Sequence, residues 1–341
     1  MENQKYKLWA QFEEKNYVII TPYLLPENIT KKVNIGDGFI MDSIVRLIGA
    51  RPHKIISSRA PLTKENIEII NESKLVLVAG ANILKDKFEI TPNFNIRLME
   101  QIKKPIVLCG IGHFGIEEYT KNGLSSESVE IIDEILKRFP YISVRCDESK
   151  RYLTKSLTGN FENVLMTSCP VIYPVNDKIK DFSFKEKYSN LIVTITDRAF
   201  LDKQLTILKA APFLFPSSKM TLALHQNYKN KQLCEYAKKI GYDVFTSENF
   251  EDFLDLYSNS DIHFGNRVHA HLKCLSLGVR SFLTPFDLRQ TFFSDSLDFP
   301  LIKKVPNEEL FTYDFNRVIK RRNNAEIKMN IFLESIKKYL I

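Results

Sequence analysis

The chain has 341 residues, of which 44% are apolar and 26% are charged, and its formal net charge is +7. This length allows a large core and two domains of ordinary size. No apolar run approaches the roughly 20 residues that cross a bilayer, and the N-terminus lacks a signal-peptide core, so we expect a cytoplasmic protein. Five cysteines without a CxxC pair argue against a metal site and against a disulfide framework.

Short β-branched runs alternate with helical patterns along the first half of the chain. The clearest helix is predicted from Ser125 to Arg138, where apolar residues recur on one face. Strands are predicted at residues 17–21, 54–57, 74–80, 105–110, 141–145 and 163–166. This alternation is typical of a parallel sheet with crossover helices.

The alternation breaks at residues 170–190, which contain two prolines, many charges and no sustained period. A domain boundary is therefore expected in this segment. The alternation then resumes, with predicted strands at 191–196, 220–224, 242–246, 261–265 and 280–284, and predicted helices around 199–210, 228–240, 249–258 and 267–277.

The pattern predicts an α/β protein with two Rossmann-like domains that face a cleft, as in GT-B transferases. We expect an N-terminal domain at residues 1–180 on the acceptor side and a C-terminal domain at 181–315 on the donor side. The last segment, 316–341, is expected to be a helix that packs back on the first domain. Its predicted apolar stripe is Met329, Phe332, Leu333, Ile336 and Leu340.

Residues suited to an anionic ligand follow the strand at 261–265, and ligands of parallel sheets bind beyond the carboxyl ends of strands. Asn266 is a predicted helix N-cap, Arg267 offers a planar donor fork, and His269 is a candidate for acid–base work. Arg267 and His269 can face one ligand only if Arg267 still lies in the turn before the helix. His271 would then point inward.

Two further candidates follow strands of the first half. Arg145 ends the run YISVR, and the sequence leaves open whether it pairs with Asp147 or binds a ligand. In the loop GIGHFG, Gly112 lets the backbone approach an anion, and His113 is a second candidate contact, although such loop histidines are more often structural.

The segment NIGDG begins an amphipathic helix. Asp37 is either a cap of this helix or a catalytic base, and Asn34 and Gly36 are candidate loop contacts. We expect Gly36 and Gly38 to let the backbone turn tightly, and we expect Asp37 to face the ligand from the first domain.

Four segments, NIGDG, PIVLCGIG, ISVRCDES and GNRVHAHLKCLSLGV, resemble in this order the polysaccharide pyruvyl transferase family, over roughly residues 30–290. The resemblance implies a GT-B-like fold and transfer of a pyruvyl group from phosphoenolpyruvate onto two hydroxyls of a sugar, with a ketal formed and phosphate released. It also implies that Arg145, Arg267 and His269 serve phosphoenolpyruvate, and no other cofactor is expected.

The chemistry of this reaction assigns roles to the candidates. Two cationic elements are needed for the carboxylate and the phosphate, which Arg145 and Arg267 supply with Asn266 beside them. His269 is the predicted acid or phosphate-side partner, and Asp37 is the predicted base for the sugar hydroxyl.

The chain departs from the family pattern in two segments of the first half. It reads VAGANIL where many members have a GGG-type turn, and it reads SCP at Ser168–Pro170 where an Asp-Pro pair is usual. These departures lie where the acceptor or the loops of the first domain would be expected. Two alternatives therefore stay open: a glycosyltransferase with a nucleotide-sugar donor, and a catalytically silent binding member of the family.

The expected partners are phosphoenolpyruvate and a saccharide of a cell-surface polysaccharide, either free or lipid-linked. Peripheral contact with the inner face of the membrane, through the C-terminal helix, is the less favoured alternative to docking of its apolar stripe. No aromatic-basic motif or recognition helix appears, so nucleic acid is not an expected partner.

Overall fold

The computed structural model describes residues 7–24, 33–116, 121–157, 161–174, 182, 188–196, 201–226, 231–303 and 312–341. By its contacts the chain divides into two units. Unit 1 comprises residues 1–31, 40–170 and 323–341, and unit 2 comprises residues 32–39 and 171–322. The contact boundary lies between Pro170 and Val171, and much of the linker expected at 170–190 lies outside the described residues.

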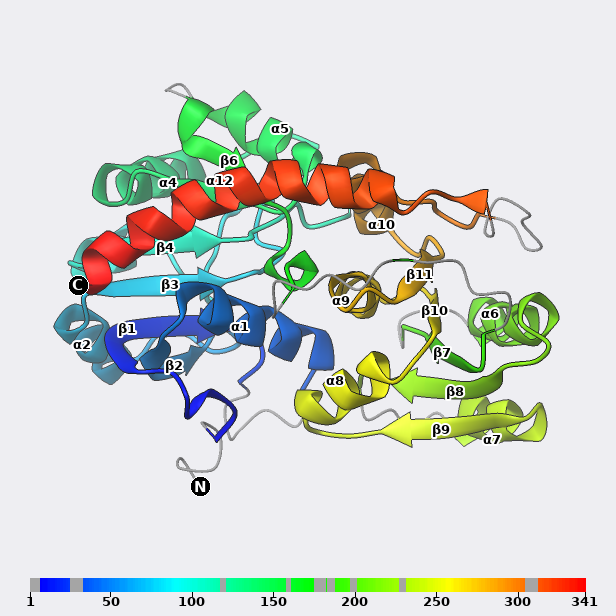
Figure 1. Ribbon diagram of the computed structural model, residues 1–341. Helices are drawn as coiled ribbons and strands as arrows, with labels where there is room; N and C mark the ends of the chain where they lie inside the picture. The colour runs from blue at the N-terminus through cyan, green and yellow to red at the C-terminus, as the bar shows by residue number, and fades with distance from the viewer. Residues whose placement is uncertain are drawn as a thin grey trace. The chain divides into compact units, whose positions relative to one another are not determined.

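Unit 1 is built on parallel strands that coincide with the predicted β-branched runs (Figure 1). Four of them form a sheet in the order β2-β1-β3-β4, and β5 pairs with β6. An isolated bridge between Ile111 and Val144 links the two groups. The strands are β1 (Glu14–Thr21), β2 (Arg51–Ser57), β3 (Leu75–Ala79), β4 (Ile106–Cys109), β5 (Ile142–Val144) and β6 (Val164–Met166).

The helices of unit 1 bury one apolar face each. In α4 (Ser126–Arg138), the Ser125 hydroxyl caps the first turn by accepting from the Ser128 N–H, and Ile131, Ile132 and Ile135 are buried, as the period predicts. The other helices between its strands are α2 (Lys64–Glu72), α3 (Ile96–Gln101) and α5 (Asp147–Ser156). Helix α1 (Ile35–Ile48) contributes its residues from Ile40 onward.

The C-terminal helix α12 (Asn316–Leu340) contributes residues from Asn323 onward to unit 1. Its predicted stripe is buried, and the ring of Phe332 lies 5.9 Å from that of Phe139. The Tyr339 hydroxyl donates to the Arg138 carbonyl at 3.3 Å. The stripe therefore docks on α4 of unit 1, the alternative that the sequence favoured.

Unit 2 contains a five-stranded parallel sheet in the order β11-β10-β7-β8-β9. Its strands also coincide with the predicted runs. They are β7 (Asn190–Thr194), β8 (Lys219–Leu224), β9 (Tyr242–Thr246), β10 (Ile262–Gly265) and β11 (Arg280–Leu283).

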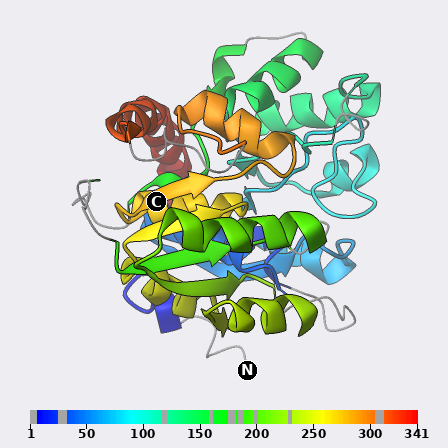
Figure 2. The ribbon, with the colours of Figure 1, turned by 90° about the vertical axis from the view of Figure 1, so that its right-hand side faces the viewer.

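The connections of unit 2 make its strand order reverse at one point. The chain steps outward from β7 to β8 and β9 through α6 (Leu201–Leu214) and α7 (Lys231–Lys239), which contact each other. It returns through α8 (Phe250–Ser258) to β10, on the other side of β7, and continues through α9 (Val268–Ser276) to β11. Figure 2 shows α6 and α7 flanking these strands, and α10 (Leu288–Leu297) follows β11. The reversal between β7 and β10 is the switch point at which open α/β sheets bind ligands.

A buried polar network lies beneath α9. The Ser281 hydroxyl bonds to Nδ1 of His263 at 2.6 Å and to Nδ1 of His271 at 2.7 Å, and Nε2 of His263 bonds to the Thr194 hydroxyl at 2.7 Å. Burial lowers the pKa of His263 to about 3 and lowers the pKa of His271 well below its usual range. Both rings are therefore neutral, and His271 points inward as expected.

Two Rossmann-like α/β units, each with its own parallel sheet, give the GT-B-like fold that the sequence predicts. In the described part of the chain, no helix combines the length and the apolarity that a bilayer crossing requires.

Candidate functional site

Arg267 lies at the switch point of unit 2. It lies two residues beyond β10, and its Nε donates to the carbonyl of Ile195, just beyond β7, at 3.1 Å. Its Nη2 also reaches the side-chain oxygen of Gln226, beyond β8, at 3.4 Å. The guanidinium is thus oriented from three neighbouring strand ends, where a planar donor fork suits a carboxylate or a phosphate.

Helix α9 begins one residue later than predicted. Arg267 is its N-cap residue, with extended backbone dihedrals, and His269 lies in the first turn. Arg267 is therefore still in the turn, which is the condition for both side chains to face one ligand. The first N–H groups of the helix have no acceptor within it, and its positive dipole end favours an anion.

Asn266 is not the N-cap of α9. It is 4% exposed, and its side-chain oxygen accepts from the backbone N–H of Thr196 at 2.6 Å, across to β7. Its own carbonyl accepts from the Gln290 amide at 3.2 Å. Asn266 therefore links the loop that follows β10 to the loop that follows β7. Its side-chain oxygen accepts a hydrogen bond from the loop after β7 instead of from its own helix.

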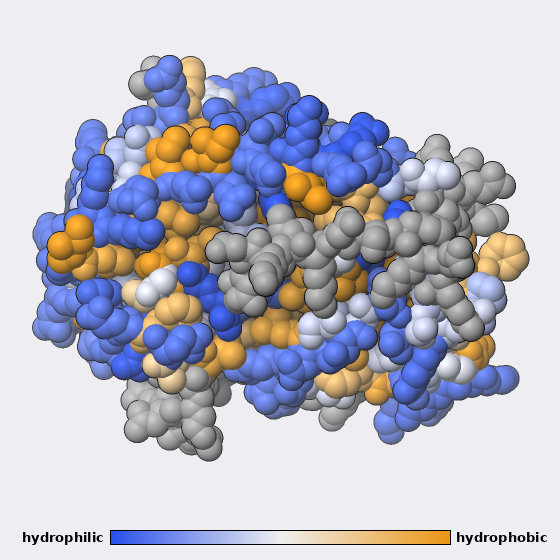
Figure 3. Space-filling view, viewed as in Figure 1, coloured by the Kyte–Doolittle hydropathy of each residue, from blue (hydrophilic) through white to orange (hydrophobic). Residues whose placement is uncertain are grey.

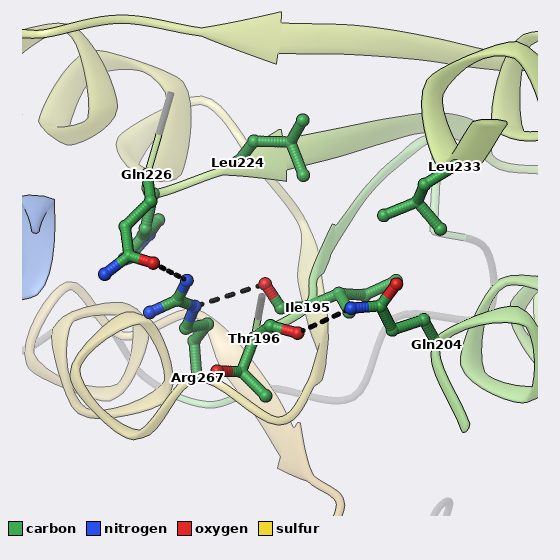
Figure 4. Close-up of a pocket in the computed structure, with 8 residues that line it drawn as sticks. Ile195, Thr196, Gln204, Leu224, Gln226, Leu233 and Arg267 are labelled. Atoms are coloured by element: carbon green, nitrogen blue, oxygen red, sulfur yellow. Dashed lines mark hydrogen bonds between the residues drawn. The ribbon is translucent and has the colours of Figure 1, made fainter. Parts of the chain in front are cut away.

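A small pocket opens beside Arg267 (Figure 4). The Gln204 amide donates to the Thr196 carbonyl at 3.0 Å, and the Gln204 side-chain oxygen is buried without a hydrogen-bond partner among the described residues. The lining residues are Ile195, Thr196, Gln204, Leu224, His225, Gln226, Leu233 and Arg267. Apolar walls with a few convergent polar groups are typical of small-molecule sites.

The first turn of α1 belongs to unit 2, which corrects the expectation that Asp37 lies in the first domain. The Ile35 N–H donates to the carbonyl of His225 at the end of β8, at 3.1 Å. The ring of Phe39 packs edge-on against His225 at 5.6 Å and against Phe250 at 6.3 Å. A backbone bond and an aromatic cluster therefore attach this turn to the strand ends of unit 2.

Gly36 lies directly against His269. A Cβ atom at Gly36 would be 2.6 Å from Nδ1 of His269, which is closer than real Cβ contacts come. Gly36 and Gly38 are regular helical residues of α1 and do not form the tight turn that we expected. Gly36 is needed instead for the close approach of the imidazole.

Asp37 lies in the first turn of α1 and is 9% exposed. The Asn34 carbonyl accepts from the Asp37 N–H at 3.0 Å, and the Asn34 side chain accepts from the Gly36 N–H at 3.4 Å. Asn34 thus occupies the capping position. The contact of Gly36 with His269 brings the turn that carries Asp37 onto the start of α9.

In unit 1, Arg145 lies at the carboxyl end of β5 and is 4% exposed. Its Nη2 donates to the carbonyl of His113 at 2.9 Å, and a Cβ at Gly112 would be 1.8 Å from its Nε. Gly112 is thus required because the guanidinium passes directly over it. The loop residues that we expected near an anion therefore orient Arg145.

His113 has a structural role in this loop. Its Nδ1 accepts from the Gly115 N–H at 3.1 Å, and its ring packs edge-on against Tyr152 at 5.2 Å. Burial lowers its pKa, with opposing and smaller effects from Glu148 and Arg145. A neutral ring that accepts a backbone bond suits a loop support.

Of the residues that line this pocket, only Arg267 was predicted from the sequence, and the polar side chains of Thr196, Gln204 and Gln226 were among those missed. Thr196 and Gln226 directly follow the regions of β7 and β8, so the rule that ligands lie at strand carboxyl ends would have found them. Gln204 comes from α6, and nothing in the sequence pattern marks it. In the described part of the chain, no three His, Cys, Asp or Glu side chains gather as a metal site would require.

Comparison with known proteins agrees with this geometry. The family model described as polysaccharide pyruvyl transferase matches residues 34–285, which include every candidate residue named above. No curated protein sequence matches the chain.

Among solved structures, a UDP-N-acetylglucosamine 2-epimerase from Rickettsia bellii is similar, with a TM-score of 0.52 and 13% identity, over 96% of this chain and 97% of that one. The epimerase of Neisseria meningitidis bound to UDP-GlcNAc has a TM-score of 0.48 and 14% identity, over 95% of this chain and 100% of that one. At 13% identity, the likeness to the Rickettsia bellii enzyme shows the fold alone.

Proposed function

The chain belongs to the polysaccharide pyruvyl transferase family, and from this premise we propose that it transfers a pyruvyl group from phosphoenolpyruvate to a sugar of a cell-surface polysaccharide or of its lipid-linked precursor. The observation that carries the proposal is the contact of Gly36 with His269. It joins the turn with Asp37 to the helix start with Arg267, so that a cation, an imidazole and a carboxylate share one unit.

The donor site is proposed at the start of α9. Arg267 and the helix dipole supply positive charge to the phosphate or the carboxylate of phosphoenolpyruvate.

The reaction requires two proton transfers. One sugar hydroxyl adds to the central carbon of the enol phosphate, and a proton goes to the methylene carbon, which becomes a methyl group. The second hydroxyl then displaces phosphate, which leaves with the other hydroxyl proton, and the ketal closes. We assign the removal of the hydroxyl proton to Asp37 and proton delivery, to carbon or to the departing phosphate, to His269.

Arg145 is the proposed second cation for the donor. It is oriented at a strand carboxyl end of unit 1, and a donor with two anionic groups needs a second positive charge. Its convergence with Arg267 on one ligand stays a prediction. The membership of the family and the cationic strand ends support it.

Ligand binding followed by turnover tests the proposal. The unmodified chain is heated with phosphoenolpyruvate, with UDP-GlcNAc and with UDP, and a ligand that binds the folded state raises the melting temperature. Phosphate release from phosphoenolpyruvate is then measured with saccharide acceptors.

Stabilisation by phosphoenolpyruvate alone, with acceptor-dependent phosphate release, is the expected result. Stabilisation by UDP-GlcNAc with productive sugar transfer would replace the proposal by a glycosyltransferase. Binding of phosphoenolpyruvate without any turnover, across acceptors, would indicate a silent binding member.

A further inference from the structure

Helix α12 exposes isoleucines on the face opposite its docked stripe. Ile327 is 63% exposed and Ile331 is 46% exposed, and the two lie one turn apart on the same side of the helix. Ile341, just beyond the helix, is 92% exposed. Three of the seven large hydrophobic residues that are exposed in the described part of the chain therefore belong to its last 15 residues. Figure 3 shows a hydrophobic patch over the middle of α12 with hydrophilic residues around it.

Basic residues surround these isoleucines. Lys320 lies seven residues before Ile327, and Lys338 lies seven residues after Ile331, so both fall close to the line of the isoleucines. Lys337 is 48% exposed at its side chain and pairs with Glu334 at 3.0 Å. The basic residues of this face are Lys320, Arg321, Lys328, Lys337 and Lys338, against two acids, Glu326 and Glu334. The face therefore carries a surplus of positive charge.

Self-association through this face is disfavoured by its charges. A parallel pair of α12 helices would oppose Lys320 and Lys338 with their own copies. An antiparallel pair that brings Ile327 onto Ile331 would bring Lys338 onto Lys320. Like charges at these positions repel. The face is complementary to a negatively charged surface, and its apolar centre requires that surface to accept hydrocarbon.

We propose that the outer face of α12 binds an anionic lipid surface, with Ile327 and Ile331 entering the headgroup boundary and the lysines contacting the headgroups. An amphipathic helix of this kind lies in the plane of the interface, and its affinity combines buried apolar area with attraction to anionic lipid. Two isoleucines and a few lysines give reversible attachment. The inference is independent of the reaction, because none of these residues belongs to the proposed site.

Vesicle co-sedimentation of the full chain tests this surface. The probes are vesicles of phosphatidylcholine alone and vesicles that also contain phosphatidylglycerol. We expect binding only to the anionic vesicles, with release at high salt. The pair Lys337→Glu and Lys338→Glu should weaken this binding by about ten-fold or more, and the pair Ile327→Asn and Ile331→Asn by a similar factor.

Matched controls distinguish binding through this surface from nonspecific hydrophobic or electrostatic binding. Phe213→Asn removes a side chain that is 71% exposed on α6, and Lys64→Glu reverses a lysine that is 93% exposed at its side chain on α2. Both should leave vesicle binding unchanged. Equal binding to neutral vesicles, or unchanged binding of either α12 pair, would overturn the proposal. A dimer in sedimentation velocity that the isoleucine pair abolishes would overturn it in favour of a second copy.

Discussion

Replacing Gly36 by alanine tests the proposed chemistry at the point where α1 meets α9. The added Cβ would lie 2.6 Å from Nδ1 of His269, whereas ordinary contact begins at 3.4 Å, so the imidazole must move by about 0.8 Å (3.4 minus 2.6). A misplacement of about 1 Å in a catalytic group can lower a rate by about 10²-fold. We therefore expect Gly36→Ala to lower turnover by about two orders of magnitude.

The substitution should not weaken the helix itself, because alanine in a helix is favoured over glycine by about 0.5–1 kcal/mol. Phosphoenolpyruvate affinity should change little, since Arg267 is oriented by Ile195 and Gln226 and not by Gly36. The readout is phosphate release, with donor affinity measured separately by thermal shift.

A double-mutant cycle shows whether Gly36 acts through the imidazole. His269→Ala alone should lower turnover by about 10²- to 10⁴-fold, which is typical of a missing acid–base group. If Gly36 acts only by positioning His269, the double variant is no slower than His269→Ala. Additive losses, or unchanged turnover of Gly36→Ala, would refute this reasoning.

Three other predictions follow from described contacts. Arg267→Ala should weaken phosphoenolpyruvate binding by about 10²-fold, measured as lost thermal stabilisation, because an anion loses its charged donor; retained stabilisation would contradict it. Gly112→Ala should displace the guanidinium of Arg145, whose Nε lies 1.8 Å from the added Cβ, and a donor affinity that does not fall would remove Arg145 from the donor site. Stability should fall on acidification below about pH 6.5, because burial lowers the pKa of three fully buried histidines, besides that of His113, and the unfolded chain takes up protons that the folded chain excludes. Each of the three contributes about 1.4 kcal/mol for each pH unit below 6.5, so urea unfolding at pH 7.5 and 5.5 should differ by about 4 kcal/mol, and a flat profile would contradict the argument. These residues are His225, His263 and His271.

The strands could be predicted from the sequence because parallel sheets buried on both faces require β-branched runs, and such runs are local. Each predicted strand in both halves corresponds to an observed strand, and the bounds of the two differ by at most a few residues. The position of Arg267 also followed from a local rule, that of strand carboxyl ends. The start of α9 was predicted one residue too early. Asn266 does not cap this helix, because its side chain bonds to Thr196, which lies 70 residues away in the sequence.

The role of Gly36 could not be predicted, because it depends on a residue far along the chain. Glycine beside aspartate indicates a turn when only neighbours are considered. The structure has a regular helix there, and the missing side chain makes room for His269, which follows β10 in the other half of the sequence. Gln204 lacked a signal for the same reason, since α6 brings it over the end of β7.

In the network beneath α9, the direction of donation is the same in every hydrogen bond. Ser281 has one hydroxyl proton and two imidazole partners, so it donates to one ring and must accept from the other. His271 has no partner at Nε2 among the described residues, and a bare lone pair there costs less than an unpaired N–H. His271 therefore carries its proton on Nδ1 and donates to Ser281, Ser281 donates to Nδ1 of His263, and His263 carries its proton on Nε2 and donates to Thr194. The two rings are opposite tautomers, and reversing either one requires every proton of the chain to move together.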